Sequence, residues 1–539
     1  MTGAEAMVKC LQEQGISVVF GYPGVAIAPF YNSLYHSDIK SILVRQEQNA
    51  GHAASGYARV TRKPAVCIAT SGPGATNLIT GLATAYADSI PMVAITGQVS
   101  TQLLGKDVFQ EADIVGCCEP FVKYSYLVKD VRDIPRIFKE AFYIASTGRQ
   151  GPVLIDVPID IQKQEFNYVE PGPVSIRGYK PKVQGHIVQI KKVVDAISKA
   201  KRPLICAGGG VILGHAEPML QQFCEKNGIP VVTTMMGVGS MPKRHPLFFG
   251  MLGTNGKPYA NRALAQCDLL IIVGARVNDR AILMPSSKLE QNRLIIHIDI
   301  DTAEIGKNIG PTIPLVGDAR LVFENLLSYD IPTDYGTWVE DLRAIKKGCV
   351  DNRIFHEGFI NPCHFVEHLT ERMEEDAIYV ADVGQNQLWS ADNYVMKKGR
   401  FLTTGGFGTM GYSIPAAIGA KMAFPDRQVV AVCGDGSFQM SLNELATMLQ
   451  NNIKVKVIVM KNMYLGLVRE YQYNNYDANY IAVELGDIPN LERIAQAYDM
   501  DYFHVKSTEK MDQTIEKFLA CENSALMVCH VYKFDKVKE

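Results

Sequence analysis

An aspartate between two glycines and an asparagine further along the chain form the pair with the clearest chemical potential. Gly434-Asp435-Gly436 follows the apolar residues Val432-Cys433, and Asn462 follows a second apolar run. The 27 positions from Asp435 to Asn462 match one strand–helix–strand crossover. Because such a crossover returns its second strand beside the first, we expect both side chains at one carboxyl edge of a parallel sheet.

A carboxylate and an amide oxygen at one sheet edge could hold a cation together with a diphosphate. With backbone carbonyls and phosphate oxygens they make an all-oxygen site of the kind that Mg²⁺ prefers. The two glycines allow backbone N–H groups to approach the phosphates closely. The turn alone would also fit a strand–turn–helix in which Asp435 merely caps the helix. The spacing to Asn462 favours the diphosphate interpretation.

Bulk composition describes a large globular protein. The chain has 539 residues, 47% hydrophobic and 20% charged, which predicts three or four domains. A net charge of −2 argues against nucleic-acid partners, and no apolar run reaches 18 residues, so we expect no membrane association. The twelve cysteines lack metal-binding spacing, and the first residues resemble a helix start rather than a targeting peptide. These features predict a cytoplasmic protein with reduced thiols.

Strand and helix patterns alternate along three segments that must position these residues. The segments span 1–165, 183–330 and 358–539, and the linkers at 166–182 and 329–357 include a helical pattern at 337–347. This alternation predicts an α/β fold with three doubly wound parallel-sheet domains. Strands are expected at 16–20, 42–44, 65–70, 91–96, 203–207, 269–273 and 294–298, and a helix rich in small residues at 50–60. Gly24, Glu47 and Gly74 fall at the ends of predicted strands, where ligands bind such sheets.

Longer stretches extend the pattern across nearly the whole chain. They are FGYPG at 20–24, SGPGATN at 71–77, TGQV at 96–99, FQEAD at 109–113, GPVLIDVP at 151–158, IDIDTAEIGK at 298–307, GTMGYSIPAAIGA at 408–420 and GDGSF at 434–438. In this order they resemble the thiamine diphosphate (ThDP) enzymes, and among them the catalytic subunits of acetohydroxyacid synthase, also called acetolactate synthase.

The resemblance implies a function for each domain and a reaction. Residues 1–165 would bind the ThDP pyrimidine, 183–330 would form a central domain of the FAD or nucleotide-binding type, and 358–539 would bind the diphosphate. The enzyme would decarboxylate pyruvate and join the remaining two-carbon unit to pyruvate or 2-ketobutyrate. Such a reaction belongs to branched-chain amino acid biosynthesis, although a catabolic role stays open.

The resemblance also assigns the ThDP and Mg²⁺ contacts. Glu47 would contact N1′ of the aminopyrimidine and so promote loss of the thiazolium C2 proton, which makes it a catalytic residue. Asp435, Asn462 and the main-chain carbonyl of Tyr464 would bind Mg²⁺. Asn386 stands where the family usually has histidine, and its amide could still donate to a phosphate. The implied ThDP positions are Pro23, Glu47, Pro73, Asn77, Gln385, Asn386, Gly408, Met410, Gly434, Asp435, Gly436, Ser437, Asn462, Tyr464, Leu465 and Gly466.

For the substrates, the resemblance implies Val25, Phe109, Gln110, Lys123 and Tyr471. Gln110 and Lys123 are also expected to take part in catalysis, since the second ketoacid carboxylate needs a cation or N–H donors. An exposed lysine with no such role is the alternative for Lys123. Tyr471 replaces the tryptophan with which biosynthetic members favour 2-ketobutyrate, so acceptor preference stays open.

Biosynthetic members of the family bind FAD in the middle domain, which makes FAD an expected cofactor here. The implied positions are Arg149, Gly208, Gly209, Gly210, Gly253, Arg276, Asp299 and Asp318. Two stretches depart from the family. Val277-Asn278-Asp279-Arg280 replaces FDDR, and Leu252 replaces the histidine of GMHG.

The resemblance further implies a homodimer or homotetramer whose active sites lie between subunits, and leaves room for a separate regulatory subunit. Two other functions fit part of the sequence. One is another ThDP enzyme on the same scaffold, namely a decarboxylase, an oxidase or a 2-hydroxyacyl-CoA lyase. The other is a ThDP-binding protein without catalytic activity, against which Glu47 argues because binding alone does not need that carboxylate.

Overall fold

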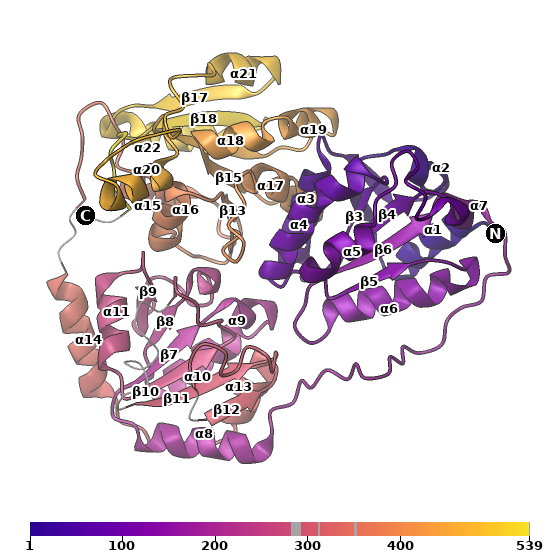
Figure 1. Cartoon of the computed structure of the whole chain (residues 1–539). Helices are drawn as coiled ribbons and strands as arrows, with labels where there is room; N and C mark the ends of the chain where they lie inside the picture. The colour runs from indigo at the N-terminus through magenta and orange to yellow at the C-terminus, as the bar shows by residue number, and fades with distance from the viewer. Residues whose placement is uncertain (282–292, 311–312, 350–352, 538–539) are drawn as a thin grey trace.

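Three parallel sheets form the framework of the protein in the computed structural model, which describes residues 1–281, 293–310, 313–349 and 353–537. Each sheet has six strands, and all its strand pairs run parallel, with helices on both faces. The three units are called the first, middle and third domains, and they meet around a common centre (Figure 1). The predicted α/β architecture is confirmed, whereas the exact domain limits stay a prediction.

The first sheet has the strand order β2-β1-β3-β4-β6-β5. Its strands are β1 (Val18–Gly21), β2 (Lys40–Leu43), β3 (Ala65–Ala69), β4 (Met92–Gln98), β5 (Tyr124–Leu127) and β6 (Pro152–Pro158). Its helices are α1 (Gly3–Glu13), α2 (Ala28–Tyr35), α3 (Glu47–Thr61), α4 (Pro73–Ala87), α5 (Ile114–Cys118), α6 (Ile134–Ser146) and α7 (Ile159–Lys163). The central strands β3, β4 and β6 are buried along their whole length, as expected for a sheet covered on both faces.

The middle sheet has the order β12-β11-β10-β7-β8-β9. Its strands are β7 (Pro203–Ala207), β8 (Val231–Thr233), β9 (Phe248–Met251), β10 (Leu269–Val273), β11 (Leu294–Asp299) and β12 (Ile313–Val316). Its helices are α8 (Ile187–Lys199), α9 (Gly209–Leu213), α10 (Glu217–Asn227), α11 (Pro258–Gln266) and α13 (Ala319–Leu327). The strands predicted at 203–207 and 269–273 are observed with those bounds.

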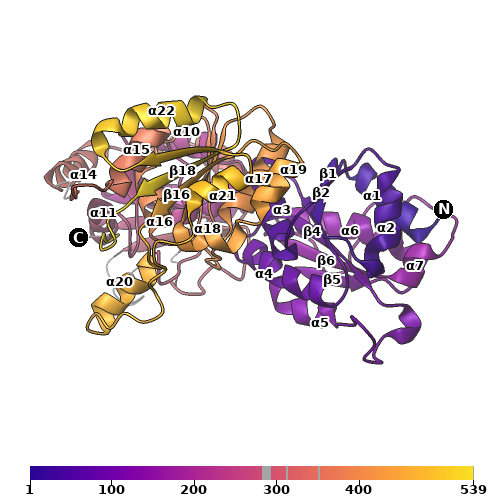
Figure 2. The ribbon, with the colours of Figure 1, turned by 90° about the horizontal axis from the view of Figure 1, so that it is seen from above.

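The third sheet has the order β14-β13-β15-β16-β18-β17. Its strands are β13 (Ile378–Ala381), β14 (Arg400–Leu402), β15 (Val429–Gly434), β16 (Lys456–Lys461), β17 (Asp501–Val505) and β18 (Ala525–His530). Its helices are α15 (Pro362–Arg372), α16 (Gln385–Asn393), α17 (Ser413–Ala423), α18 (Asp435–Ser441), α19 (Glu444–Gln450), α20 (Gly466–Asn475), α21 (Leu491–Ala497) and α22 (Met511–Ala520). Helix α20 projects from the body of the molecule (Figure 2).

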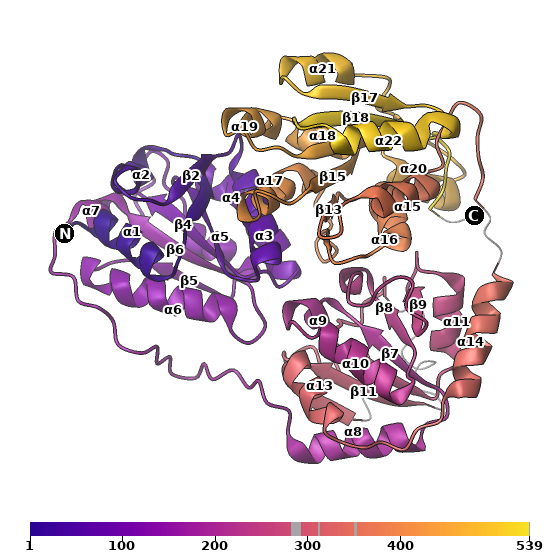
Figure 3. The same cartoon turned by 180° about the vertical axis from the view of Figure 1, so that it is seen from behind.

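The two linkers differ in form. After α7 the first linker has no helix, and it runs as a long irregular trace from the first to the middle domain (Figure 3). The second contains α14 (Gly336–Gly348), close to the predicted 337–347. None of the helices among the described residues is long and apolar enough to cross a bilayer.

Small residues allow the first and third domains to approach closely. Helix α3 packs on both α4 and α17, and Figure 1 shows it between the two domains. A Cβ at Gly56 would lie 2.0 Å from the Ala416 carbonyl oxygen, and one at Gly419 would lie 1.8 Å from that of Ala53. Any larger side chain at these two positions would push α3 away from α17.

Candidate active site

Asp435 and Asn462 lie beside each other at the carboxyl edge of the third sheet. Strands β15 and β16 are neighbours, and Asp435 begins α18 directly after β15. The Asp435 Oδ2 accepts a hydrogen bond from the backbone N–H of Met463 at 2.6 Å, and Asn462 precedes that residue. The Asn462 Oδ1 accepts from the Tyr464 N–H at 3.0 Å. The crossover predicted from the spacing therefore brings both side chains to one edge.

The side chains of Asp435 and Asn462, with the backbone beside them, offer the oxygen ligands that a hard cation such as Mg²⁺ prefers. We call these two strand ends the Asp435–Asn462 turn. Both side chains are 6% exposed, and burial raises the pKa of the Asp435 carboxyl to about 6. A divalent cation would offset that cost by stabilising the charged form. The described residues contain no group of three or more His, Cys, Asp or Glu side chains able to hold a metal. The available ligands are thus one carboxylate, one amide oxygen and backbone carbonyls, a set that phosphate oxygens would complete.

Gln385 and Asn386, expected to contact a diphosphate, are bound within the protein. The Gln385 Oε1 accepts from Asn462 Nδ2 at 3.1 Å, and its Nε2 donates to Glu470 and to the Asp535 carbonyl, both at 2.9 Å. The Asn386 amide donates to the carbonyls of Asp382 and Val432 at 3.0 and 3.1 Å. Both N–H groups of the Asn386 amide are used by these carbonyls, and its expected contact with a phosphate stays a prediction. The Gln385 side chain positions Asn462.

Close approach fixes the glycines of this edge. A Cβ at Gly436 would lie 2.7 Å from Leu465 Cδ2 and 3.5 Å from Met410 Cε, and one at Gly466 would lie 2.0 Å from Gln385 Oε1. A Cβ at Gly434, by contrast, would meet nothing nearer than 3.9 Å. Glycines 436 and 466 are therefore needed to pack Leu465 and Gln385 against the turn.

Met410 reaches the same turn from a segment held by a buried carboxylate. The fully buried Asp382 accepts from the backbone N–H groups of Gly411 at 2.9 Å and Ser413 at 2.7 Å. Gly408 and Gly411 have φ angles of 72° and 84°, which favour glycine. The Ser437 hydroxyl donates to the Val383 carbonyl at 3.1 Å, which ties α18 to the end of β13. We call this group around Asp435, Asn462, Gln385 and Met410 the third-domain half-site.

Glu47 is at the carboxyl edge of the first sheet. It is the first residue of α3, and its Oε2 accepts from Asn77 Nδ2 at 3.0 Å. A Cβ at Gly74 would lie 3.3 Å from Glu47 Oε1, so the start of α4 approaches the carboxylate closely. Pro73 is the first residue of α4. Glu47, Pro73 and Asn77, expected to share a site, are together.

The surroundings of Glu47 are open. Val25 begins a short 3₁₀ turn after β1 and is 77% exposed, and Phe109 is 86% exposed. Gln110 has a left-handed φ of 59°, and its Cα would lie 2.9 Å from a Cβ at Gly72. Pro23 is also exposed. We call this group around Glu47, Asn77, Val25 and Gln110 the first-domain half-site.

Lys123, expected in the substrate pocket, is elsewhere. It precedes β5 and so lies at the amino edge of the first sheet, opposite to Glu47. Its Nζ donates to the carbonyls of Ile144 and Thr147 and to the Tyr179 hydroxyl at 3.0 Å. Burial lowers its pKa to about 8. The expectation of a substrate-binding lysine is therefore corrected: its three donors are used in joining α6 to the first linker.

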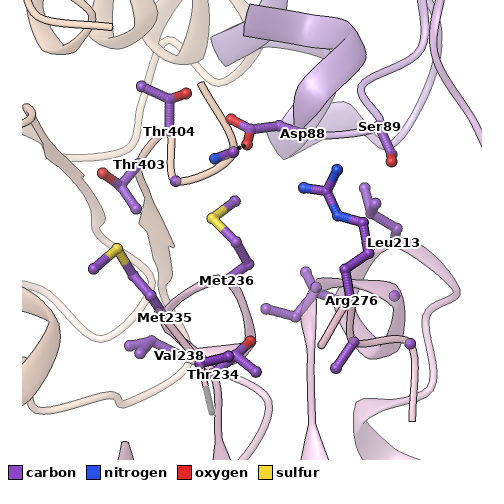
Figure 4. A pocket seen from close by; sticks show the side chains of 18 of the residues that line it. Asp88, Ser89, Leu213, Thr234, Met235, Met236, Val238, Arg276, Thr403 and Thr404 are labelled. Atoms are coloured by element: carbon purple, nitrogen blue, oxygen red, sulfur yellow. Dashed lines mark hydrogen bonds between the residues drawn. The ribbon is translucent and has the colours of Figure 1, made fainter. Parts of the chain in front are cut away.

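A cavity of about 710 Å³ opens where the three domains meet. Its size falls in the range of cofactor and ligand pockets, about 300–1,000 Å³. Figure 4 shows Met235, Met236 and Val238 of the middle domain facing Thr403 and Thr404 of the third domain and Asp88 and Ser89 of the first. The residues expected to bind FAD that line it are Arg149, Gly209, Gly210, Arg276, Asp299 and Asp318. Gly208 and Gly253 are outside that lining.

Charged groups stand at several points of the cavity wall. The Arg276 guanidinium points into the cavity (Figure 4). Arg149 pairs with Asp301 at 3.2 Å and Glu304 at 3.0 Å. Burial raises the pKa of Asp299 to about 6, and Asp318 caps α13 through the Arg320 and Leu321 N–H groups. An arginine, carboxylates at two strand ends and a glycine turn after β7 suit a dinucleotide.

The cavity wall also contains residues that were not expected to bind FAD. Leu252, which replaces an expected histidine, gives the wall an apolar surface. Tyr471 and Gly408 also line the cavity, so the residue expected to select the acceptor lies on its third-domain side. The wall at Asp88, Arg59 and Thr404 was missed by the sequence analysis, since only the packing of three domains brings these residues together.

Comparison with known proteins gives the class of this fold and site. Three models match: the N-terminal TPP-binding domain of thiamine pyrophosphate enzymes at residues 1–117, their central domain at 190–326 and their C-terminal TPP-binding domain at 382–531. Thiamine pyrophosphate is ThDP. The two matched binding domains contain Glu47 and the Asp435–Asn462 turn respectively.

Curated relatives narrow the class. The chain is 44% identical to a probable acetolactate synthase large subunit of Methanocaldococcus jannaschii, over 98% of this chain and 91% of the relative. It is 43% identical to the acetolactate synthase large subunit of Corynebacterium glutamicum, over 96% of this chain and 84% of the relative. The chain therefore belongs to the acetolactate synthase large-subunit family of thiamine pyrophosphate enzymes.

Proposed function

We propose that the protein is a ThDP- and Mg²⁺-dependent acetolactate synthase, which converts two molecules of pyruvate into 2-acetolactate and CO₂. The observation that carries this proposal is identity of 44% over 98% of the chain to a probable acetolactate synthase large subunit, with Glu47 and the Asp435–Asn462 turn both present. Bound ThDP supplies the electron sink for breaking the bond to the pyruvate carboxylate.

Glu47 is proposed to exchange a proton with N1′ of the aminopyrimidine. Its carboxylate accepts one bond, from Asn77, which fixes its orientation and leaves Oε1 available. Proton exchange of this kind typically contributes 10²–10⁴-fold to a rate. Asp435, Asn462 and the Tyr464 carbonyl are proposed to hold Mg²⁺ against the diphosphate, and Gln385 orients Asn462 through its Oε1.

FAD is proposed as the ligand of the cavity between the domains. Arg276 points into it. Asp299 ends β11 and Asp318 follows the neighbouring strand β12, so hydroxyl groups of a dinucleotide would find acceptors there. A flavin absorbs at about 450 nm, so absorbance near that wavelength in the purified protein would support this proposal. Reconstitution with FAD that leaves neither absorbance nor a change in melting temperature would oppose it.

Two copies of the chain are proposed to complete each active site. In a single chain the residues flanking Glu47 contact the third domain at Glu444 and Thr447 of α19, and α18 separates α19 from the turn at Asp435. The exposed Val25 and Phe109 leave the first-domain half-site free to meet another surface. A dimer or tetramer would bring the third-domain half-site of a second copy there. A small regulatory partner is also proposed, since the relatives are named large subunits.

A product assay tests the proposed reaction. Purified protein is supplied with pyruvate, ThDP and Mg²⁺, with and without 2-ketobutyrate, and acetolactate is separated from acetaldehyde. Acetolactate as the main product is expected. Acetaldehyde alone would favour a decarboxylase, and an acyl-CoA-dependent reaction would favour a 2-hydroxyacyl-CoA lyase. If ThDP binds without any turnover, the protein is a binding protein.

A further inference from the structure

A buried carboxylate of the third domain holds the start of the helix that carries Glu47. Glu444, the first residue of α19, is fully buried. Its Oε1 accepts from the backbone N–H of Arg45 at 2.8 Å and from Asn49 Nδ2 at 2.9 Å. Arg45 lies two residues before Glu47 and Asn49 two residues after it. A single oxygen atom of Glu444, which is some 400 residues away in sequence, thus binds the chain on both sides of Glu47.

Helix α3 has no side-chain cap of its own. The first N–H groups of a helix have no partner within it, and a side chain at the cap usually accepts from one of them. Gln46 occupies the cap of α3 in an extended conformation and makes no such bond. Glu444 instead fixes the segment from outside, through the N–H before the cap and the side chain in the first turn.

Two further residues of α19 hold the same segment. The Thr447 hydroxyl lies 2.7 Å from Glu444 Oε2 and 3.2 Å from the Leu43 carbonyl at the end of β2. The Gln450 Oε1 accepts from Arg45 Nη2 at 2.6 Å. Glu444, Thr447 and Gln450 are spaced three apart and so share one face of the helix. That face fixes residues 43–49 as a unit.

We infer that Glu444 is a positioning residue for Glu47, and that it acts through the backbone of residues 45–49 rather than by touching substrate or cofactor. The inference rests on the proposed function, which gives Glu47 its catalytic role. A misplacement of about 1 Å can cost about 100-fold in rate, so loosening this segment should lower turnover more than cofactor binding.

Two substitutions of Glu444 distinguish the effect of its hydrogen-bond geometry from the effect of its negative charge. In Glu444→Gln the amide oxygen can still accept from Arg45 and Asn49. The amide nitrogen can donate to Thr447, whose hydroxyl then donates to Leu43 alone. In Glu444→Ala the bonds of the carboxylate to Arg45, Asn49 and Thr447 are lost. A matched control is Glu371→Ala, which removes a different contact between domains, the ion pair with Arg244.

The test begins with hydrogen–deuterium exchange of the protein without cofactors. Glu444→Ala is expected to speed exchange of the peptide covering 44–50 by about tenfold or more, as local opening becomes easier. Glu444→Gln and Glu371→Ala should leave this peptide unchanged. Unchanged exchange in Glu444→Ala would overturn the inference. This readout does not depend on the reaction, so it separates failure of the inference from failure of the proposed function.

Turnover then tests the consequence for Glu47. For Glu444→Ala we expect kcat to fall by about tenfold or more, with the Kd of ThDP and the KM of pyruvate within threefold of the parent. Glu444→Gln should retain at least half of the parent kcat. A full kcat in Glu444→Ala, or an equal loss in both variants, would contradict a positioning role that depends on geometry.

Discussion

The two half-sites differ in how completely a single chain organises them. In the third-domain half-site, Asp435, Asn462 and Gln385 are nearly fully buried and bonded to one another or to backbone groups. In the first-domain half-site, Val25 and Phe109 are largely exposed, and Glu47 accepts a single side-chain bond. The part proposed to hold a metal and diphosphate is preorganised within the chain, whereas the part proposed to do proton chemistry is open.

We expect the third-domain half-site to govern cofactor binding and the first-domain half-site to govern the rate of reaction. The contacts that support the two half-sites also differ. The third-domain turn is held by its own sheet, because β15 and β16 are neighbours. The segment around Glu47 is held from another domain, because Glu444 of α19 accepts from the Arg45 N–H just before α3. Variants in the two half-sites should therefore fail in different measurements.

The largest effect is expected from Glu47→Gln. This change keeps the shape of the side chain and removes its ability to carry a proton, so kcat should fall by about 10²–10⁴-fold. The Kd of ThDP, measured by quenching of intrinsic fluorescence, should change less than threefold. A variant that turns over normally would show that this carboxylate has no role in proton exchange.

The opposite pattern is expected from Asp435→Asn in the third-domain half-site. Loss of the only carboxylate among the proposed Mg²⁺ ligands should raise the Kd of ThDP by roughly 100-fold. Chelation of Mg²⁺ with EDTA should release ThDP from the parent protein in the same way. Glu492→Gln, which changes an exposed carboxylate on α21, is the control and should bind ThDP normally. If Asp435→Asn bound ThDP as tightly as the parent protein, Asp435 would not be part of the cofactor site.

An intermediate effect is expected from Tyr471→Trp on the cavity wall. A larger ring should shift the product ratio toward acetohydroxybutyrate when pyruvate and 2-ketobutyrate compete, by an amount equivalent to about 1–3 kcal/mol. Tyr473→Trp, on the same helix but outside the cavity lining, should leave the ratio as it is. If the parent protein and both variants gave the same product ratio, Tyr471 would have no role in the choice of acceptor.

The smallest effect on activity is expected from Lys123→Met. Loss of the bonds to Ile144, Thr147 and Tyr179 should lower the free energy of unfolding by about 2 kcal/mol. The KM of pyruvate should stay within twofold, because Lys123 is at the sheet edge away from Glu47. Lys129→Met, an exposed lysine after β5, should change neither quantity. A tenfold rise in the KM of pyruvate would restore the original interpretation of Lys123.

Sequence reasoning succeeded where local pattern determines position. Buried strands, a glycine turn and one crossover length were enough to bring Asp435 and Asn462 to one edge. It failed for Lys123 because a motif does not reveal which end of a strand a residue occupies. It also missed the internal bonds of Gln385 and Asn386, since a hydrogen-bond partner such as Asp535 is distant in sequence.

The contacts between domains could not be predicted from one sequence. Glu444 looks like an ordinary helix residue, and nothing near it indicates Arg45 or Asn49. The same is true of Glu217, whose Oε1 pairs with Arg62 of the first domain at 2.5 Å and with Arg400 of the third at 3.1 Å. The short glycine contacts between α3 and α17 were visible only as a stretch rich in small residues.

The central claim is that two copies of the chain share each active site, and co-expression of Glu47→Gln with Asp435→Asn tests it most directly. With ThDP supplied near the Kd of the parent protein, each variant alone should have almost no activity. In a dimer with shared sites, a mixed pair contains one site built from two intact half-sites. Random pairing should then restore about a quarter of the parent activity, since half of the dimers are mixed and half of their sites are intact. Activity no higher than that of the separate variants would contradict the shared site.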